Sequence, residues 1–215
     1  MENDRDLQKD VQDAIKWDPL LKNTQITVLA DDGLITLSGI VKSYLDKSQV
    51  EAVTKSVYGV KAIIAHMTVN LATHDEVSDE DIAKNVLAAF KLNWVPYDRI
   101  QIKVEDGHVT LDGEMEYNFQ KETATKSVSS VKGVKVFTNN VILIAETPNQ
   151  LEKKNVEHAL LRYSATVDQN IRVKVENNTI TLSGTVQSFY QKEEAEKIAW
   201  NAPGVLMVNN ELIIE

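Results

Sequence analysis

The chain has 215 residues, of which 26% are charged and 43% hydrophobic, and its formal net charge is -9. This composition is typical of a folded globular protein and excludes a largely disordered one, while the complete lack of cysteine excludes disulfides and thiolate chemistry. Because the negative charge is spread over the chain as roughly -2, -5 and -2, without a cluster of lysine or arginine, we expect no nucleic-acid partner.

One sequence pattern occurs three times. The copies read DGLITLSG from Asp32, DGHVTLDG from Asp106 and NNTITLSG from Asn177, and residues 26–59, 100–133 and 171–204 align without a gap. A fixed internal period indicates repeated copies of one folding unit. We therefore expect three domains, at residues 1–71, 72–146 and 147–215, joined by short polar linkers at about 72–77 and 145–149.

Each copy opens with a pattern typical of an amphipathic helix. In the first copy Leu7, Val11 and Ile15 recur at helical spacing. In the second copy Ser78, followed three residues later by an acidic residue, marks a helix start. Proline at positions 19 and 96 limits the first two helices at their far ends.

Two strands follow in each copy. Apolar residues alternate along 26–30 and 35–41, and the Asp-Gly pair between the two runs predicts a tight hairpin. The opposite face of the sheet should be exposed to solvent, because it carries Thr36 and Ser38 and their equivalents. A glycine recurs on the apolar side, where we expect its missing side chain to let a helix approach the sheet: Gly39, Gly113 and Gly184.

A second helix and a last strand complete each copy. The helix is predicted at residues 43–58, 117–132 and 188–202, with C-terminal caps at Gly59, Gly133 and Gly204. The predicted fold class is therefore α+β. It consists of three tandem αββαβ domains, each with a three-stranded mixed sheet and two helices on one face.

This pattern resembles the BON domain family. The signature is Leu-x-Gly-x-Val on the second strand, at 37–41 and 182–186, and with methionine last at 111–115, followed by Gly-Val at 59, 133 and 204. An asparagine that the family often carries is present at Asn139 and Asn210 but is replaced by Ala65 in the first copy. The resemblance implies a non-enzymatic binding module, found in osmotic-stress proteins of the envelope, phospholipid-binding lipoproteins and a cytoplasmic potassium-binding protein.

The residues that could carry chemistry do not form a known catalytic or metal-binding pattern. His66, His74, His108 and His158 lie in different elements, without metal-ligand spacing. The acidic residues of 75–81 lack the glycine and spacing of an EF-hand, and the Leu-Ser-Gly repeats lack the nucleophile elbow of a hydrolase. We therefore predict no enzyme activity, no cofactor and no metal site, and we interpret the six repeated glycines as structural.

Three hypotheses for function stay open at this point. The first is a protein of osmotic or envelope stress that binds phospholipid or protein surfaces through its open sheet faces and the clefts between copies. The second, implied by the resemblance, is a potassium binder that uses main-chain carbonyls between domains. The third is a holdase chaperone with exposed apolar surface. Trp17, Trp94 and Trp200 do not occupy equivalent repeat positions. Trp200, in the last long helix, is expected in a core or an interdomain contact, whereas its exposure beside Tyr190 would instead indicate a partner or membrane-edge site.

The N-terminus bears on localisation. Its first six residues are acidic and lack the basic and apolar regions of a secretory signal. The sequence as written thus predicts a cytoplasmic protein, and a periplasmic one if a leader has been removed. No apolar stretch approaches the ~18 residues that a membrane span requires.

Overall fold

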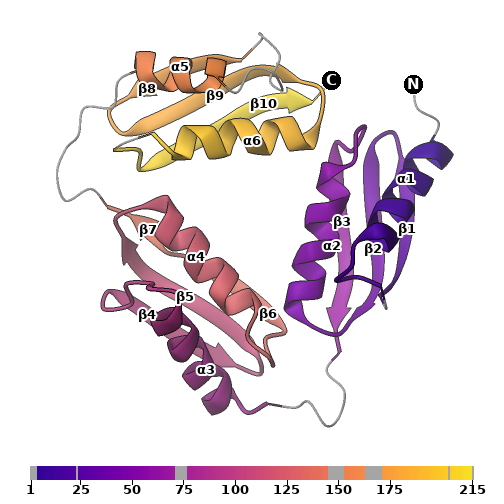
Figure 1. Cartoon of the computed structure of the whole chain (residues 1–215), viewed down its shortest axis with the longest axis vertical. Coiled ribbons are helices and arrows are strands. Elements are labelled where there is room, and N and C mark those ends of the chain that lie inside the picture. Colours follow the sequence, from indigo (N-terminus) through magenta and orange to yellow (C-terminus); the bar gives the residue numbers. More distant parts are fainter. Residues whose placement is uncertain are drawn as a thin grey trace.

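The computed structural model describes residues 4–22, 24–70, 77–144, 153–162, 171–202 and 204–214. They form three small α+β domains (Figure 1). Domain 1 contains α1 (Asp4–Trp17), β1 (Gln25–Asp31), β2 (Leu34–Val41), α2 (Tyr44–Ser56) and β3 (Ala62–Val69). Domain 2 contains α3 (Asp79–Leu92), β4 (Ile100–Glu105), β5 (His108–Met115), α4 (Asn118–Ser129), β6 (Val136–Asn139) and β7 (Ile142–Leu143). Domain 3 contains α5 (Lys153–Arg162), β8 (Arg172–Glu176), β9 (Thr179–Val186), α6 (Phe189–Trp200) and β10 (Met207–Ile214).

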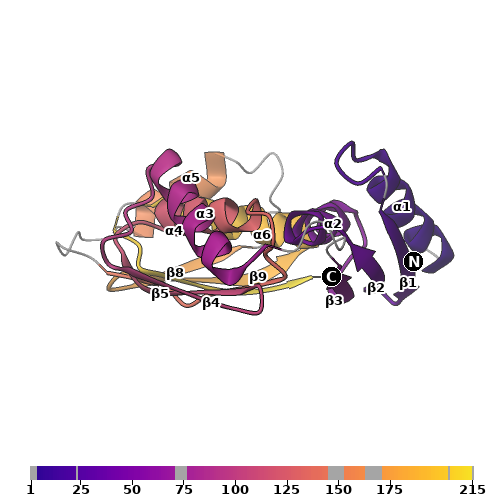
Figure 2. The same cartoon turned by 90° about the horizontal axis from the view of Figure 1, so that it is seen from below.

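The three domains share one topology. The first two strands pair antiparallel, and the last strand returns parallel to the middle one after the second helix. Figure 2 shows the helices of domains 2 and 3 above one face of their sheets, with the other face open. The predicted fold class is confirmed. In domain 2 the last strand is broken into β6 and β7, which both pair with β5.

The hairpin turns of domains 1 and 2 follow the predicted chemistry. Asp32 and Gly33 have φ angles of 46° and 82°, and Asp106 and Gly107 have φ angles of 51° and 78°. Two successive residues with positive φ form the type I′ turn, whose twist matches that of the strands it joins. Asp-Gly suits this turn because aspartate tolerates the left-handed region and glycine adopts it without strain.

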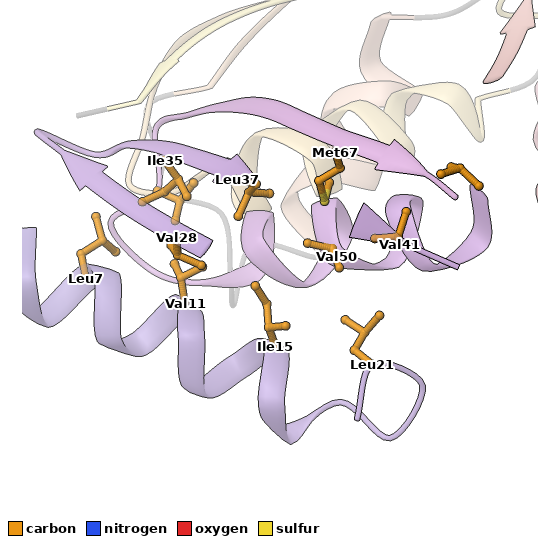
Figure 3. Packing of buried hydrophobic residues seen from close by; sticks show 12 residues of the cluster. Leu7, Val11, Ile15, Leu21, Val28, Ile35, Leu37, Val41, Val50 and Met67 are labelled. Atoms are coloured by element: carbon orange, nitrogen blue, oxygen red, sulfur yellow. The ribbon is translucent and has the colours of Figure 1, made fainter. Parts of the chain in front are cut away.

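Each domain has its own hydrophobic core. In domain 1, Leu7, Val11 and Ile15 point from α1 toward buried side chains of the sheet (Figure 3). Equivalent clusters form around Val86 in domain 2 and Val156 in domain 3. Full burial of one such aliphatic side chain contributes about 1.5–3 kcal/mol. The apolar residues that recur at helical spacing in the sequence therefore pack between the first helix and the sheet.

The helix ends and the glycines differ in detail from the prediction. The second helices end at Ser56, Ser129 and Trp200, so the glycines at 59, 133 and 204 lie in the following turns rather than at the caps. The atoms that crowd Gly39 belong to the neighbouring strand, where a Cβ would lie 2.6 Å from the Gln25 carbonyl oxygen. The expected close approach by a helix is thus an approach by β1.

The start of α3 agrees with its predicted cap. Ser78 Oγ accepts a hydrogen bond from the Asp81 amide at 3.2 Å. The predicted linkers at 72–77 and 145–149 lie outside the described residues, apart from Val77.

Candidate functional site

Large apolar side chains are exposed where the first helix of domains 1 and 2 ends. Trp17 and Leu20 are 89% and 65% exposed in domain 1, and Leu92 and Trp94 are 78% and 92% exposed in domain 2. Each pair occupies the same place in its repeat, directly before a buried residue that anchors the loop, Leu21 or Val95. These two segments, 17–20 and 92–94, are called the apolar loops below.

The backbone of the second apolar loop holds Trp94 outward. The Val95 amide donates to the Phe90 carbonyl at 2.9 Å and the Trp94 amide donates to the Lys91 carbonyl at 3.4 Å, the pattern of a Schellman motif. Trp94 occupies the position that favours glycine, with a φ of 56°. A left-handed conformation costs a residue with a side chain about 1–2 kcal/mol. The chain therefore carries a bulky residue at a strained position where it makes little contact.

The charge around the apolar loops differs from that of the whole chain. Exposed Lys16 and Lys22 flank the first loop, and Lys91 and Arg99 flank the second. Only one carboxylate lies within each of these stretches, at positions 18 and 98. Each loop is thus locally basic on a chain with a net charge of -9.

The open sheet faces are mainly polar, as predicted. In domain 2, His108 Nε2 lies 2.9 Å from Thr138 Oγ1, and Asn140 Nδ2 donates to Asp112 Oδ1 at 2.9 Å. In domain 3, Lys174 pairs with Glu176 on the same face. Exposed apolar residues also lie on these faces, at Leu29 and Ile40 in domain 1, Val136 and Ile142 in domain 2, and Met207 and Ile213 in domain 3.

The second helices of the three domains surround a common centre (Figure 1). The start of α2 points toward the end of α4, the start of α4 toward the end of α6, and the start of α6 toward the end of α2. Helix N-termini carry partial positive charge and C-termini partial negative charge, so this head-to-tail order is electrostatically favourable. We refer to the three contacts as the 1–2, 2–3 and 3–1 junctions.

An aromatic contact forms the 1–2 junction. The ring of Tyr44 on α2 meets that of Phe137 on β6 edge-on, with centroids 6.2 Å apart. Burial and the neighbouring Glu51 carboxylate raise the pKa of Tyr44, against a smaller lowering by a hydrogen bond with Ser48. The hydroxyl is therefore neutral at physiological pH.

A charged contact forms the 3–1 junction. Lys55 Nζ on α2 lies 2.6 Å from Glu193 Oε1 on α6 and 5.3 Å from the centre of the Phe189 ring. A partly exposed ion pair of this kind contributes about 0.2–1 kcal/mol, and a cation–π contact a similar amount. Beside them lies a cleft of about 370 Å³, lined by Phe189, by Glu51 and Lys55 of α2, and by three residues of the 62–65 segment.

The 2–3 junction contains a wider cleft between α4 and α6, of about 450 Å³. From α4 it is lined by Asn118, Lys121 and Glu122, and from α6 by Glu193, Glu196, Lys197 and Trp200. Trp200 is half-buried and also packs against the core of domain 3, as expected for an interdomain contact.

The charged groups of this cleft are held by hydrogen bonds. Glu196 Oε2 accepts from Asn210 at 3.0 Å, and its Oε1 accepts from the Trp200 indole at 3.4 Å. Lys121 donates to the Val141 carbonyl at 2.6 Å, and burial lowers the pKa of its ammonium. A hydrogen bond to Glu194 raises the pKa of Lys197. The cleft therefore has a fixed carboxylate at Glu196, while Lys121 and Lys197 are directed at other partners.

The repeated asparagine ties the last strand to the second helix. Asn210 donates to the Lys192 carbonyl and to Glu196, and Asn139 donates to Thr125 Oγ1 at 2.9 Å. Domain 1 has Ala65 at this position, which lines the 3–1 cleft instead. The departure from the family pattern thus leaves space between β3 and α2.

We expect Ala65→Asn to stabilise domain 1. Glu51 occupies the place that Glu196 has in domain 3, so the new amide would gain a carboxylate acceptor, and a hydrogen bond to a charged group contributes about 1.5–3 kcal/mol. Thermal unfolding should show a higher midpoint for domain 1, whereas Asn210→Ala should lower that of domain 3. A lower midpoint for Ala65→Asn would contradict the equivalence of the two sites.

The histidines singled out in the sequence are not brought together. His66, His108 and His158 are exposed in three different domains, and His74 lies outside the described residues. In the described parts of the chain, no group of three or more His, Cys, Asp or Glu side chains could hold a metal ion. None of the described helices is long and apolar enough to cross a membrane.

Sequence reasoning missed the apolar loops and, apart from Trp200, the junction residues. An alignment of the loops that follow the first helices would have revealed the apolar loops, because both copies place large apolar residues just before the buried Leu21 and Val95. The junctions depend on how complete domains pack against each other, and the residue pattern within one copy carries no information on that packing.

Comparison with known proteins agrees with the repeat. Osmotically-inducible protein Y of Escherichia coli (strain K12) is 28% identical over 129 residues, and the match covers 56% of this chain and 63% of that protein's length. Two structures of CdsD, a structural protein of the type III secretion system of Chlamydia trachomatis, align over 99% and 98% of this chain at 17% and 16% identity. Their TM-scores are only 0.27 and 0.26, so they carry no further argument. The model of the BON domain matches residues 3–70, 78–145 and 153–215, and the chain therefore belongs to the BON domain family.

Proposed function

We propose that this chain is a non-enzymatic binding protein of the osmotic or envelope stress response that docks onto phospholipid membranes through its two apolar loops. The observation that carries the proposal is the exposure of Trp17, Leu20, Leu92 and Trp94 at matching repeat positions. The name of the Escherichia coli relative supports the link with osmotic stress.

The chemistry of the loops suits the interface of a bilayer. Tryptophan is favoured at the headgroup level, where its ring is apolar and its indole N–H can still be hydrated. Burial of a large apolar side chain contributes about 1.5–3 kcal/mol, so the insertion of a loop with two such residues supplies useful affinity. The strain at Trp94 also favours a binding role, because folding alone gains little from an exposed indole.

Electrostatics predicts an unusual dependence on salt. The net charge of -9 repels an anionic membrane, while the local lysines and Arg99 attract it only at short range. Since the Debye length falls from ≈ 10 Å at 0.1 M salt to 3 Å at 1 M, salt screens the long-range repulsion more than the short contacts. Binding to anionic vesicles should therefore not weaken as salt rises, unlike that of a polybasic protein.

The test is sedimentation with phosphatidylcholine vesicles, with and without phosphatidylglycerol. Replacing Trp17, Leu20, Leu92 and Trp94 by serine should reduce binding at least tenfold. A matched control replaces Ile40 and Ile213, which are 62% and 65% exposed on open sheet faces, and should bind like the parent. Equal binding by the two variants would contradict docking through the loops.

A single substitution separates the binding role of Trp94 from its structural role. Trp94→Gly should relieve the left-handed strain of about 1–2 kcal/mol, offset by the larger entropy of glycine in the unfolded chain. We expect domain 2 to be as stable as the parent or slightly more so in thermal unfolding, while vesicle binding falls. Loss of stability together with unchanged binding would show that the indole serves folding.

The other functions considered from the sequence stay predictions. If no vesicle binds but the protein prevents aggregation of an unfolded client, the apolar loops serve protein surfaces, as a holdase chaperone requires. Potassium binding and the cellular compartment likewise stay predictions.

A further inference from the structure

The three junctions are copies of one head-to-tail contact. Tyr44, Asn118 and Phe189 occupy the same repeat position, the first residue of the second helix. The side chains that receive them in the next domain are equivalent too. Phe137, which receives Tyr44, corresponds to Ile63, which lines the cleft beside Phe189. Glu51 and Lys55 of that cleft correspond to Glu196 and Trp200, which line the cleft beside Asn118.

This equivalence makes the 2–3 junction the exception. The first residue of the helix presents an aromatic ring to the next domain at the 1–2 and 3–1 junctions, but an amide at the 2–3 junction. The aromatic residues of domain 2, Tyr117 and Phe119, lie on either side of Asn118 and stack on each other with centroids 5.6 Å apart. Both are exposed, at 55% and 64%. The cleft at the 2–3 junction is thus the wider of the two and lacks a ring from α4.

The receiving wall of this junction is nevertheless suited to a ring and a positive charge. Trp200 offers an aromatic surface, and the carboxylates of Glu122 and Glu196 line the cleft. The two lysines of the lining are directed elsewhere, Lys121 at the Val141 carbonyl and Lys197 at Glu194, while the third glutamate, Glu193, is paired with Lys55. The carboxylate of Glu196 is held in place by Asn210 and Trp200 and needs no reorganisation to meet a cation. At the 3–1 junction the chain itself combines these elements, with the Lys55 ammonium between Glu193 and the Phe189 ring.

We propose that the cleft between α4 and α6 is a binding site for a small aromatic amine. Its ring stacks against Trp200, in the place that Tyr44 and Phe189 fill at the other junctions, and its ammonium group pairs with Glu196 and Glu122. A cation near an aromatic face and a carboxylate is stabilised by both. This site is independent of the apolar loops, and its ligand would bridge domains 2 and 3.

The test uses phenethylamine as the probe and Trp200 fluorescence as the signal, in a Trp17→Phe, Trp94→Phe background where Trp200 is the remaining tryptophan. Phenethylamine should shift the fluorescence saturably, whereas phenylacetate, which has the same ring and the opposite charge, should bind at least tenfold more weakly. Equal binding of the two probes would overturn the assignment to an amine.

Two variants test the place of the ring and the charge. Asn118→Phe should supply the missing ring from within the chain, raise the unfolding midpoint and abolish phenethylamine binding. Glu196→Gln should weaken binding at least tenfold. Lys126→Phe adds a ring to an exposed position of the same helix and should bind like the parent. Unchanged binding by Asn118→Phe, with a folded protein shown by its unfolding curve, would overturn the proposal.

Discussion

Replacing Gly113 with alanine is expected to destabilise domain 2 by about 3 kcal/mol or more. Gly113 lies on β5 with a φ of 135°, and a Cβ built there would overlap the carbonyl oxygen of Arg99 on the neighbouring segment. Strain from an overpacked site costs about 1–3 kcal/mol, and the positive φ adds about 1–2 kcal/mol. The only relief is movement of the backbone, which would disturb the hydrogen bond from the Glu114 amide to the Arg99 carbonyl.

Calorimetry measures this effect directly. For a domain of this size, 1 kcal/mol shifts the unfolding midpoint by about 4–8 °C, so the transition of domain 2 should move by more than 10 °C. The neighbouring Glu114→Ala, at an exposed position of the same strand, should change stability by less than about 0.5 kcal/mol. If Gly113→Ala unfolds like the parent, the glycine of the family signature has no steric role at this position.

Leu37→Ala is expected to destabilise domain 1 by about 2–5 kcal/mol. Leu37 is fully buried between the sheet and the helices (Figure 3), and its truncation removes apolar contact and leaves a cavity. Because the three cores are separate, domains 2 and 3 should keep their folds when domain 1 unfolds. They lose the contacts of the 1–2 and 3–1 junctions, including those of Tyr44 and Lys55.

Two-dimensional NMR distinguishes the three domains in this variant. Amide signals of domain 1 should collapse toward unfolded positions, while those of domains 2 and 3 move only near Phe137 and Phe189. Thr36→Ala, on the wet face of the same strand, should cost less than about 1 kcal/mol. Simultaneous loss of signals from all three domains would mean that the junctions couple folding much more strongly than their few contacts suggest.

The sequence predicted the architecture of one domain well, because each step of that prediction is local. The stripe of Leu7, Val11 and Ile15 and the Asp-Gly turn report on residues that are neighbours in the helix or hairpin. What could not be predicted depends on contacts between domains. Tyr44 and Phe189 look like ordinary first residues of a helix until another domain is placed against them.

The exposure of the apolar loops could not be predicted from the sequence for a related reason. Apolar residues close together in the sequence are buried at Leu21 and Val95 and exposed at Leu20 and Trp94. Their difference depends on the backbone at the helix end. The Schellman hydrogen bonds turn Val95 inward and Trp94 outward, and tryptophan is not the residue that this motif normally signals. Residue preferences alone would therefore favour glycine at position 94 and would not indicate an exposed tryptophan.

The head-to-tail order of the junctions has a consequence for assembly. In each domain the start of the second helix faces one neighbour, and the end of that helix faces the other neighbour. Such a contact joins two different surfaces and is called heterologous, and a series of heterologous contacts forms a filament unless it closes into a ring. Here the ring of contacts closes after three domains, and the start of each second helix points toward the end of another (Figure 1). The tandem arrangement thereby turns these helix ends toward one another within one chain instead of leaving them open to contact with other copies.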